Sequence, residues 1–319
     1  MILAAGAGTR LYPLTAALPK PMVPVANEPV LAHVIRNLHR QGFDQLAINL
    51  SHLPDAIRSY FGDGSAYGVS IRYSFEPEPL GTAGGVKRLG DFWDQDFLVI
   101  GGDDLTDMEL SGMIAFHRQH QGLATIALYP VADPSLYGVA VLDRDRRITA
   151  FQEKPPRDEA LSNLCNTGVY LFSPRVLELI PDGFHDFGRE LFPALVAQGA
   201  PVYGYPAQGY WRDIGNPREY LAANLDLLCG RTTLPAREPP AGAQVHPGAR
   251  LLPPVCLGEG VIVESGAIVG PNCVIGDRCH IHAGARLADC VLWPGVDIKK
   301  GTEVASAIVA PHCTLEVAP

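Results

Sequence analysis

The last quarter of the chain carries an apolar residue at every sixth position, and this period constrains the fold more than any other feature. After eight consecutive matches, Trp293 keeps the register, Lys299 breaks it and Ala305 resumes it. Small apolar residues recur four positions after each of the eight matches. The pattern predicts a left-handed parallel β-helix over residues 243–319, in which each short strand forms one flat side of a coil. The eight matching positions are Val245, Leu251, Leu257, Val263, Val269, Ile275, Ile281 and Leu287.

Two histidines in this region raise the question of a second activity. β-Helices of this kind often carry acyltransferases, which need a catalytic histidine. His280 and His282 lie on either side of the inward position Ile281, so we expect both to face solvent. Cys273 and Cys279 occupy small inward positions and are expected in the core. We therefore interpret the β-helix as an oligomerisation or regulatory module of a homo-oligomer, and an acyltransferase is the weakest hypothesis.

Residues 1–228 show a different pattern, in which apolar strands alternate with amphipathic helices. This order predicts an α/β domain with a Rossmann-like mixed, mainly parallel sheet, whose ligand site lies at the carboxyl ends of the strands. Residues 229–242 contain three prolines and little apolar periodicity, so they are expected to form a linker.

A glycine-rich turn follows the first predicted strand, Ile2–Ala5. Gly6-Ala7-Gly8 lets backbone N–H groups approach a ligand, and Thr9 and Arg10 supply a hydroxyl and a forked cation suited to phosphate oxygens. Lys20 lies between two prolines that hold the chain extended. These residues predict a polyphosphate site, although a tight strand-to-helix connection would also explain the glycines.

Two common nucleotide loops are excluded. The dinucleotide fingerprint needs a glycine where the chain has Leu11, and the phosphate loop needs a Gly-Lys pair, which the chain lacks. The string G-x-G-T-R-L-x-P-L-T followed by P-K-P-M-V-P-V instead resembles the sugar-1-phosphate nucleotidyltransferase (nucleotide-sugar pyrophosphorylase) family. The resemblance implies a nucleotide site at Leu3, Ala5, Gly6, Gly8, Thr9, Arg10, Lys20, Gly81, Thr82 and Asp103.

Acidic residues in two further motifs complete the expected catalytic set. Asp103 follows a buried strand and begins the family pattern D-x-x-x-D, although Asp104 is an alternative ligand; Asp107 ends the pattern and is expected to be structural. In the W-x-D-I-G string, Asp213 corresponds to the second Mg²⁺ ligand. The resemblance therefore implies Mg²⁺ on Asp103 and Asp213, with Arg10 and Lys20 as catalytic cations.

A sugar-phosphate site is implied by the E-K-P and N-x-G motifs. In relatives, the glutamate accepts hydrogen bonds from sugar hydroxyls and the lysine holds the sugar phosphate. The corresponding residues here are Gly138, Glu153, Lys154 and Asn166. Taken alone, a Glu-Lys-Pro triplet is usually a solvated turn.

Residues 76–85, E-P-E-P-L-G-T-A-G-G, resemble the base-recognition segment of mannose-1-phosphate guanylyltransferases. We expect Thr82 to cap a helix whose N–H groups meet the base. The expected reaction joins GTP and mannose 1-phosphate into GDP-mannose and pyrophosphate. A glucose-1-phosphate uridylyl- or thymidylyltransferase, or a non-catalytic nucleotide-sugar sensor, is the alternative.

Composition narrows the cellular setting. The net charge of −9 argues against nucleic acid and anionic membranes as partners, and no apolar stretch reaches membrane-spanning length. The seven cysteines include no C-x-x-C pair, so free thiols in the cytoplasm are expected. The first strand begins so early that we expect the natural start to lie slightly upstream.

Overall fold

The computed structural model describes residues 1–235 and 242–317, which divide into two compact units. The first unit holds residues 1–7, 38–102 and 108–211; the second holds residues 8–37, 103–107 and 212–319. The division of the sequence into residues 1–228, a linker at 229–242 and residues 243–319 stays a prediction. Residues 236–241 of that linker lie outside the described residues.

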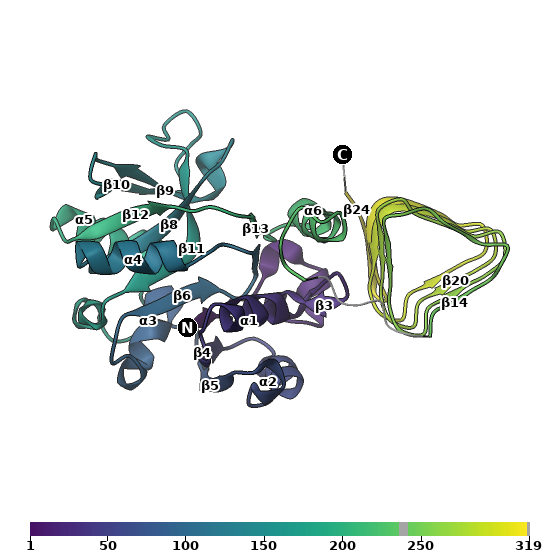
Figure 1. Cartoon of the computed structure of the whole chain (residues 1–319), viewed down its shortest axis with the longest axis horizontal. Coiled ribbons are helices and arrows are strands. Elements are labelled where there is room, and N and C mark those ends of the chain that lie inside the picture. The colour runs from purple at the N-terminus through teal and green to yellow at the C-terminus, as the bar shows by residue number, and fades with distance from the viewer. Residues whose placement is uncertain (236–241, 318–319) are drawn as a thin grey trace. The chain divides into compact units, whose positions relative to one another are not determined.

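A mixed nine-stranded sheet forms the centre of the first unit, with the strand order β10-β9-β11-β6-β1-β4-β5 and with β8 and β12 joined beside β11 (Figure 1). The β6-β1-β4-β5 half is parallel, as the alternation of strands and helices predicted. The strands are β1 (Ile2–Leu3), β4 (Gln45–Leu50), β5 (Ser70–Phe75), β6 (Phe97–Gly101), β8 (Ala124–Pro130), β9 (Gly138–Leu142), β10 (Ile148–Glu153), β11 (Leu164–Phe172) and β12 (Val202–Pro206).

Helices of the first unit pack on this sheet through their apolar faces. They are α2 (Pro54–Phe61), α3 (Gly81–Arg88), α4 (Ser111–His120) and α5 (Phe192–Ala197), while α1 (Val30–Arg40) begins in the second unit. A single π-helical turn, Phe187–Leu191, precedes α5. The rings of Phe172, Phe187 and Phe192 stack in the core beneath it. Within the described residues, no helix is both long and apolar enough to span a bilayer.

The second unit begins with the predicted glycine loop and its short 3-10 turns, η1 (Thr9–Leu11), η2 (Leu14–Ala16) and η3 (Lys20–Met22). The hairpin of β2 (Pro24–Val25) and β3 (Glu28–Pro29) follows, and β7 (Asp104–Thr106) pairs with β13 (Trp211–Asp213). Helix α6 (Pro217–Leu228) packs on strands of the solenoid that comes next. At the hairpin tip, Nδ2 of Asn27 donates to the carbonyl of Ile275, 2.9 Å away in a solenoid strand.

The solenoid is a parallel β-helix, as the six-residue period predicted, and Figure 1 shows its stacked coils in green to yellow. One side is the sheet β14-β17-β20-β22, and the other sides belong to one further sheet. Its strands are β14 (Gln244–Val245), β15 (Arg250–Leu251), β16 (Val255–Leu257), β17 (Ile262–Val263), β18 (Ile268–Val269), β19 (Cys273–Ile275), β20 (His280–Ile281), β21 (Arg286–Leu292), β22 (Asp297–Ile298), β23 (Glu303–Ala310) and β24 (Cys313–Glu316).

The register predicted for the last coils is wrong by one residue. The partner of Ile275 is Leu292, and the partner of Ile281 is Ile298, so Trp293, Lys299 and Ala305 are out of step with the inward row. The register shifts at one corner of the coil, which is one residue shorter in the later coil. Residues 270–272 separate β18 from β19, whereas residues 288–289 form the matching corner inside the continuous strand β21.

Candidate active site

Lys20 lies at the centre of an ionic cluster in the second unit. Its side chain is buried, and Nζ lies 2.6 Å from Oδ2 of Asp103 and 3.2 Å from Oδ1 of Asp213. The two aspartates are separated from Lys20 by 83 and 193 residues, yet the fold brings both to one ammonium. Pro19 and Pro21 flank Lys20 and restrict the backbone that presents it.

The pKa of Lys20 reflects two opposing effects. Burial, the larger single effect, lowers the pKa of the ammonium, but the nearby carboxylates, with Asp103 and Asp213 the strongest, together raise it above its ordinary value. Lys20 therefore stays cationic at neutral pH. Asp104, the alternative to Asp103, begins β7 and is buried.

Arg10 extends the cluster toward solvent. Nη2 of Arg10 lies 3.7 Å from Oδ2 of Asp213, and 58% of the arginine side chain is exposed. An exposed pair of this kind contributes little to stability, so the guanidinium stays available to an incoming anion. Asp107, the second acid of D-x-x-x-D, instead accepts hydrogen bonds from N and Oγ1 of Thr233, which agrees with the structural role expected for it.

Two glycines allow the close packing of this cluster. Gly8 has φ +62°, and a Cβ there would lie 2.8 Å from Cβ of Lys20. A Cβ on Gly215 would lie 2.8 Å from Oδ2 of Asp213 and 2.9 Å from Nη1 of Arg10. Sequence reasoning identified Gly8 but missed Gly215, although the W-x-D-I-G string contains it. It also missed Thr15, whose hydroxyl donates to the carbonyl of Gly8 at 3.0 Å.

In the first unit, Leu3 ends β1, and Ala5 and Gly6 follow it at the carboxyl end of the strand. A chain of buried polar groups holds this edge: N of Ala4 donates to Oδ1 of Asn49 (2.8 Å), and Nδ2 of Asn49 donates to Oε1 of Glu76 (2.9 Å). The other oxygen of Glu76 accepts from the N–H of Leu80 at 3.0 Å. These contacts were not foreseen from the sequence, because Ala4, Asn49 and Glu76 are far apart along the chain.

The expected cap of α3 is wrong. The helix begins at Gly81 with Leu80 as its N-cap, and the Thr82 hydroxyl, one residue into the helix, donates to Oδ2 of Asp186 at 3.0 Å. The N–H groups expected to meet a base are partly occupied, because the carbonyl of His185 accepts from N of Ala83 and of Gly84. Asp186, which sequence reasoning missed, also caps the π-helical turn through N of Gly188 and Arg189.

Three of the four predicted sugar-phosphate residues lie on adjacent strands of the first unit, and Lys154 directly follows the end of β10. Gly138 on β9 pairs with Glu153 on β10, and the pairing of Cys165 with Val139 places Asn166 of β11 across from Gly138. Residues opposite each other in antiparallel strands point to the same face. Gly138 leaves the space between them open, since a Cβ there would lie 2.8 Å from Oε2 of Glu153.

The predicted sugar-phosphate residues differ from one another in charge and in hydrogen bonding. Burial raises the pKa of Glu153 against the opposing effect of Lys154, whose Nζ lies 3.9 Å from Oε1. Half of the Lys154 side chain is exposed, so its ammonium is accessible to an anion. Asn166 is held by two contacts: Oδ1 accepts from N of Gly168 and Nδ2 donates to the Tyr170 hydroxyl, both at 3.0 Å.

Comparison with known proteins agrees with this geometry. Residues 1–229 match the family described as nucleotidyl transferase, and residues 251–318 match the family described as GMPPB C-terminal domain. A UTP–glucose-1-phosphate uridylyltransferase from Synechocystis is 42% identical over 78% of this chain and 67% of its own length. A mannose-1-phosphate guanylyltransferase from Mycobacterium tuberculosis is 36% identical over 94% of this chain and 81% of its own length.

A solved structure of a nucleotidyltransferase is also similar to this chain. A putative glucose-1-phosphate thymidylyltransferase from Bacillus anthracis superposes with a TM-score of 0.61 at 27% identity, covering 70% of this chain and 92% of that one. The family match spans most of the chain and includes the glycine loop, the acidic motifs and the E-K-P and N-x-G strings. The chain therefore belongs to the nucleotidyl transferase family and is a nucleotidyltransferase.

Proposed function

We propose that the protein transfers a nucleotidyl group from GTP to mannose 1-phosphate, giving GDP-mannose and pyrophosphate. The observation that carries the proposal is the convergence of Asp103 and Asp213 on the buried ammonium of Lys20. Near full-length similarity to proteins named mannose-1-phosphate guanylyltransferase supports the choice of substrates.

The acidic pair has the chemistry of a divalent metal site. Carboxylate oxygens are donors that Mg²⁺ prefers, and Asp103 and Asp213 direct theirs toward one cationic atom. These two residues would hold Mg²⁺, which we propose as the divalent metal that nucleotidyltransferases of this family generally use. When bound, the ion would neutralise charge on phosphate oxygens.

The remaining steps are assigned to side chains. A phosphate oxygen of the sugar phosphate attacks the α-phosphorus, the bond to the bridging oxygen breaks, and pyrophosphate leaves with that electron pair. The attacking phosphate is already ionised, so no general base is required. Arg10 and Lys20 stabilise charge on the departing pyrophosphate, and Lys154 holds the attacking phosphate. By analogy with an oxyanion donor, each such contact is worth about 10²- to 10³-fold in turnover.

We assign the sugar hydroxyls to Glu153 and Asn166. We assign the nucleotide to residues at the carboxyl end of β1 and at the start of α3. Residues 76–85 support a guanine base through their likeness to guanylyltransferases. The uridylyltransferase at 42% identity favours UTP and glucose 1-phosphate as the second candidate pair.

A substrate panel tests the assignment. Purified protein with Mg²⁺ is incubated with each of GTP, UTP, dTTP and ATP against mannose 1-phosphate and glucose 1-phosphate, and pyrophosphate release is measured. Fastest release with GTP and mannose 1-phosphate supports the proposal. A preference for UTP or dTTP with glucose 1-phosphate would establish the second candidate. Binding of GDP-mannose without release under any condition would identify a sensor.

We also propose that the enzyme acts in the cytoplasm as a homo-oligomer. Its seven cysteines are free thiols, as a reducing compartment favours. The first coils of the solenoid expose the apolar side chains of Val245, Leu251 and Ile262, which a second copy would cover. Light scattering on a sizing column should give at least twice the monomer mass; a monomer at micromolar concentration would contradict this arrangement.

A further inference from the structure

Three side chains with metal-binding atoms gather on the outer surface of the solenoid. We propose that Glu264, His280 and His282 bind a divalent transition-metal ion of the Zn²⁺ type. Each of the three offers one ligand atom, and these atoms all lie within 4.8 Å of one another. The proposal concerns a site distinct from the Asp103–Asp213 pair and does not depend on the proposed reaction.

The stacking of coils produces this cluster. Val263 on β17 pairs with Ile281 on β20, and both point into the core, so Glu264 and His282 occupy the same outward position in consecutive coils. His280 lies two residues before His282 on the same strand side. Parallel strands are about 4.8 Å apart, which brings side chains of neighbouring coils within reach of one ion.

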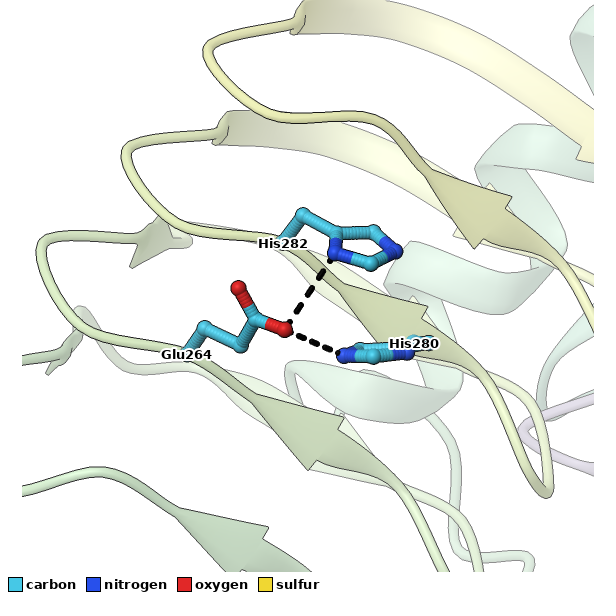
Figure 2. Close-up of side chains that lie close together, drawn as sticks. All are labelled: Glu264, His280 and His282. Atoms are coloured by element: carbon cyan, nitrogen blue, oxygen red, sulfur yellow. Dashed lines mark hydrogen bonds and ion pairs between the residues drawn. The ribbon is translucent and has the colours of Figure 1, made fainter.

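The atomic arrangement fits a metal centre. Oε1 of Glu264 lies 2.8 Å from Nε2 of His280 and 3.2 Å from Nδ1 of His282. Figure 2 shows the carboxylate and both rings turned toward one another, with one oxygen facing a nitrogen of each ring. Metal bonds of about 2.1 Å in a tetrahedron put ligand atoms about 3.4 Å apart. The two distances from Oε1 lie within about 0.6 Å of that value, and all three ligand atoms lie within 4.8 Å of one another.

Neighbouring groups hold two of the ligands in place. The other oxygen of Glu264 accepts from the N–H of Ala283 at 2.9 Å, which fixes the carboxylate and leaves Oε1 for the ion. Nε2 of His282 lies 3.3 Å from Oδ1 of Asp297, the carboxylate–histidine arrangement that orients metal-binding imidazoles.

The charges around the site favour a dication. The Glu264 carboxylate contacts both imidazole rings, and the Asp297 carboxylate contacts His282 and Lys299, whose Nζ lies 2.9 Å from Oδ1 of Asp297. Two carboxylates thus share one lysine at this site.

The donor set selects the class of metal. Two imidazole nitrogens and one carboxylate suit Zn²⁺, Co²⁺ or Ni²⁺, whereas Mg²⁺ prefers oxygen ligands. The three side chains are about one-third exposed, so one coordination position stays open to water or to a ligand from another molecule. An ion here links two coils side chain to side chain and should raise the melting temperature of the folded protein.

Co²⁺ is the probe for the test, because its visible absorption reports nitrogen ligation. Chelator-treated full-length protein is titrated with Co²⁺ and, by calorimetry, with Zn²⁺, in millimolar Mg²⁺ that occupies oxygen-rich sites. The variants are Glu264→Gln, His280→Gln and His282→Gln. His246→Gln is the matched control, since His246 precedes Glu264 by one coil in the same outward row but accepts from its own backbone at N of Gly248.

The proposal predicts one ion per chain in the wild type, in His246→Gln and in Asp213→Asn, with a metal-dependent rise in melting temperature. Loss of an outer partner such as Asp297 is expected to lower metal affinity by about 10- to 100-fold. Each ligand variant should lower the affinity by more than that. Unchanged affinity in the three ligand variants, equal loss in His246→Gln, or no binding by the wild type would overturn the site. Circular dichroism of each variant establishes that it is folded.

Discussion

Nε1 of Trp293 donates to the hydroxyl of Tyr220 at 2.9 Å, joining a solenoid residue to helix α6. The same hydroxyl donates to the carbonyl of Pro24 in the β2–β3 hairpin. Tyr220 is fully buried, and burial raises the pKa of its phenol. One hydroxyl thus satisfies polar groups from two segments that are distant in sequence.

Replacing Tyr220 by phenylalanine should therefore destabilise the protein. The ring would remain, but the indole N–H and the carbonyl would lose a partner that is itself buried, at a cost of about 1–3 kcal/mol. Urea unfolding of the full chain measures the change. Tyr60→Phe, at a half-exposed position, is the control and should stay within about 0.5 kcal/mol of the wild type. Equal stability of the two variants would show that the hydroxyl contributes nothing.

Lys20→Ala and Asp213→Asn should each lower turnover by about 10²- to 10³-fold, because each removes a charge from the proposed transition-state site. Pyrophosphate release with the best substrate pair measures the loss. Exposed Lys300 and Asp94 provide charge-matched controls, as Lys300→Ala and Asp94→Asn. Near-wild-type turnover in either site variant would refute the mechanism.

Gly8→Ala should disturb the position of Lys20. The added Cβ would meet the lysine Cβ at 2.8 Å, and alanine is strained at φ +62°. We expect lower turnover together with a stability loss of about 1 kcal/mol or more. Gly90→Ala, where nothing lies within 4 Å of the added atom, is the matched control for folding. An active and fully stable Gly8→Ala enzyme would show that the loop accommodates a side chain.

The raised pKa of Glu153 predicts a pH-dependent stability. Because the folded state holds its proton more tightly than the unfolded state, the contribution of Glu153 is fully present below the ordinary glutamate pKa of about 4.3 and is lost as pH rises through the folded pKa. Urea midpoints measured from pH 4 upward should therefore fall more for the wild type than for Glu153→Gln. The control is the exposed Glu178→Gln. Parallel profiles for the wild type and Glu153→Gln would contradict the shift.

Local patterns predicted much of the fold but not its long-range polar contacts. Helix α2, Pro54–Phe61, begins at a proline and buries Ile57 and Phe61, which are local signals that the sequence carries. The start of α3 was misjudged because the group that meets its first N–H groups, the carbonyl of His185, lies about a hundred residues away. In the solenoid, a fixed period could not anticipate a corner shortened by one residue at 288–289.

In the candidate site too, local motifs were predicted and long-range polar contacts were not. Lys20, Asp103 and Asp213 were predicted from motifs, and the structure brings them together. Asn49 and Asp186 were missed, because a buried amide or carboxylate that organises a backbone has no motif of its own. Glu76 belongs to the predicted segment 76–85, but its contact with Asn49 was not foreseen. Their roles follow from partners that only the folded chain supplies.

The bond from Asn27 to the carbonyl of Ile275 spans 248 residues. A ribosome has therefore released the glycine loop, Lys20 and the hairpin long before the residue that secures the hairpin tip exists. A nascent chain halted before residue 275 would therefore carry the glycine loop and the hairpin without this anchor.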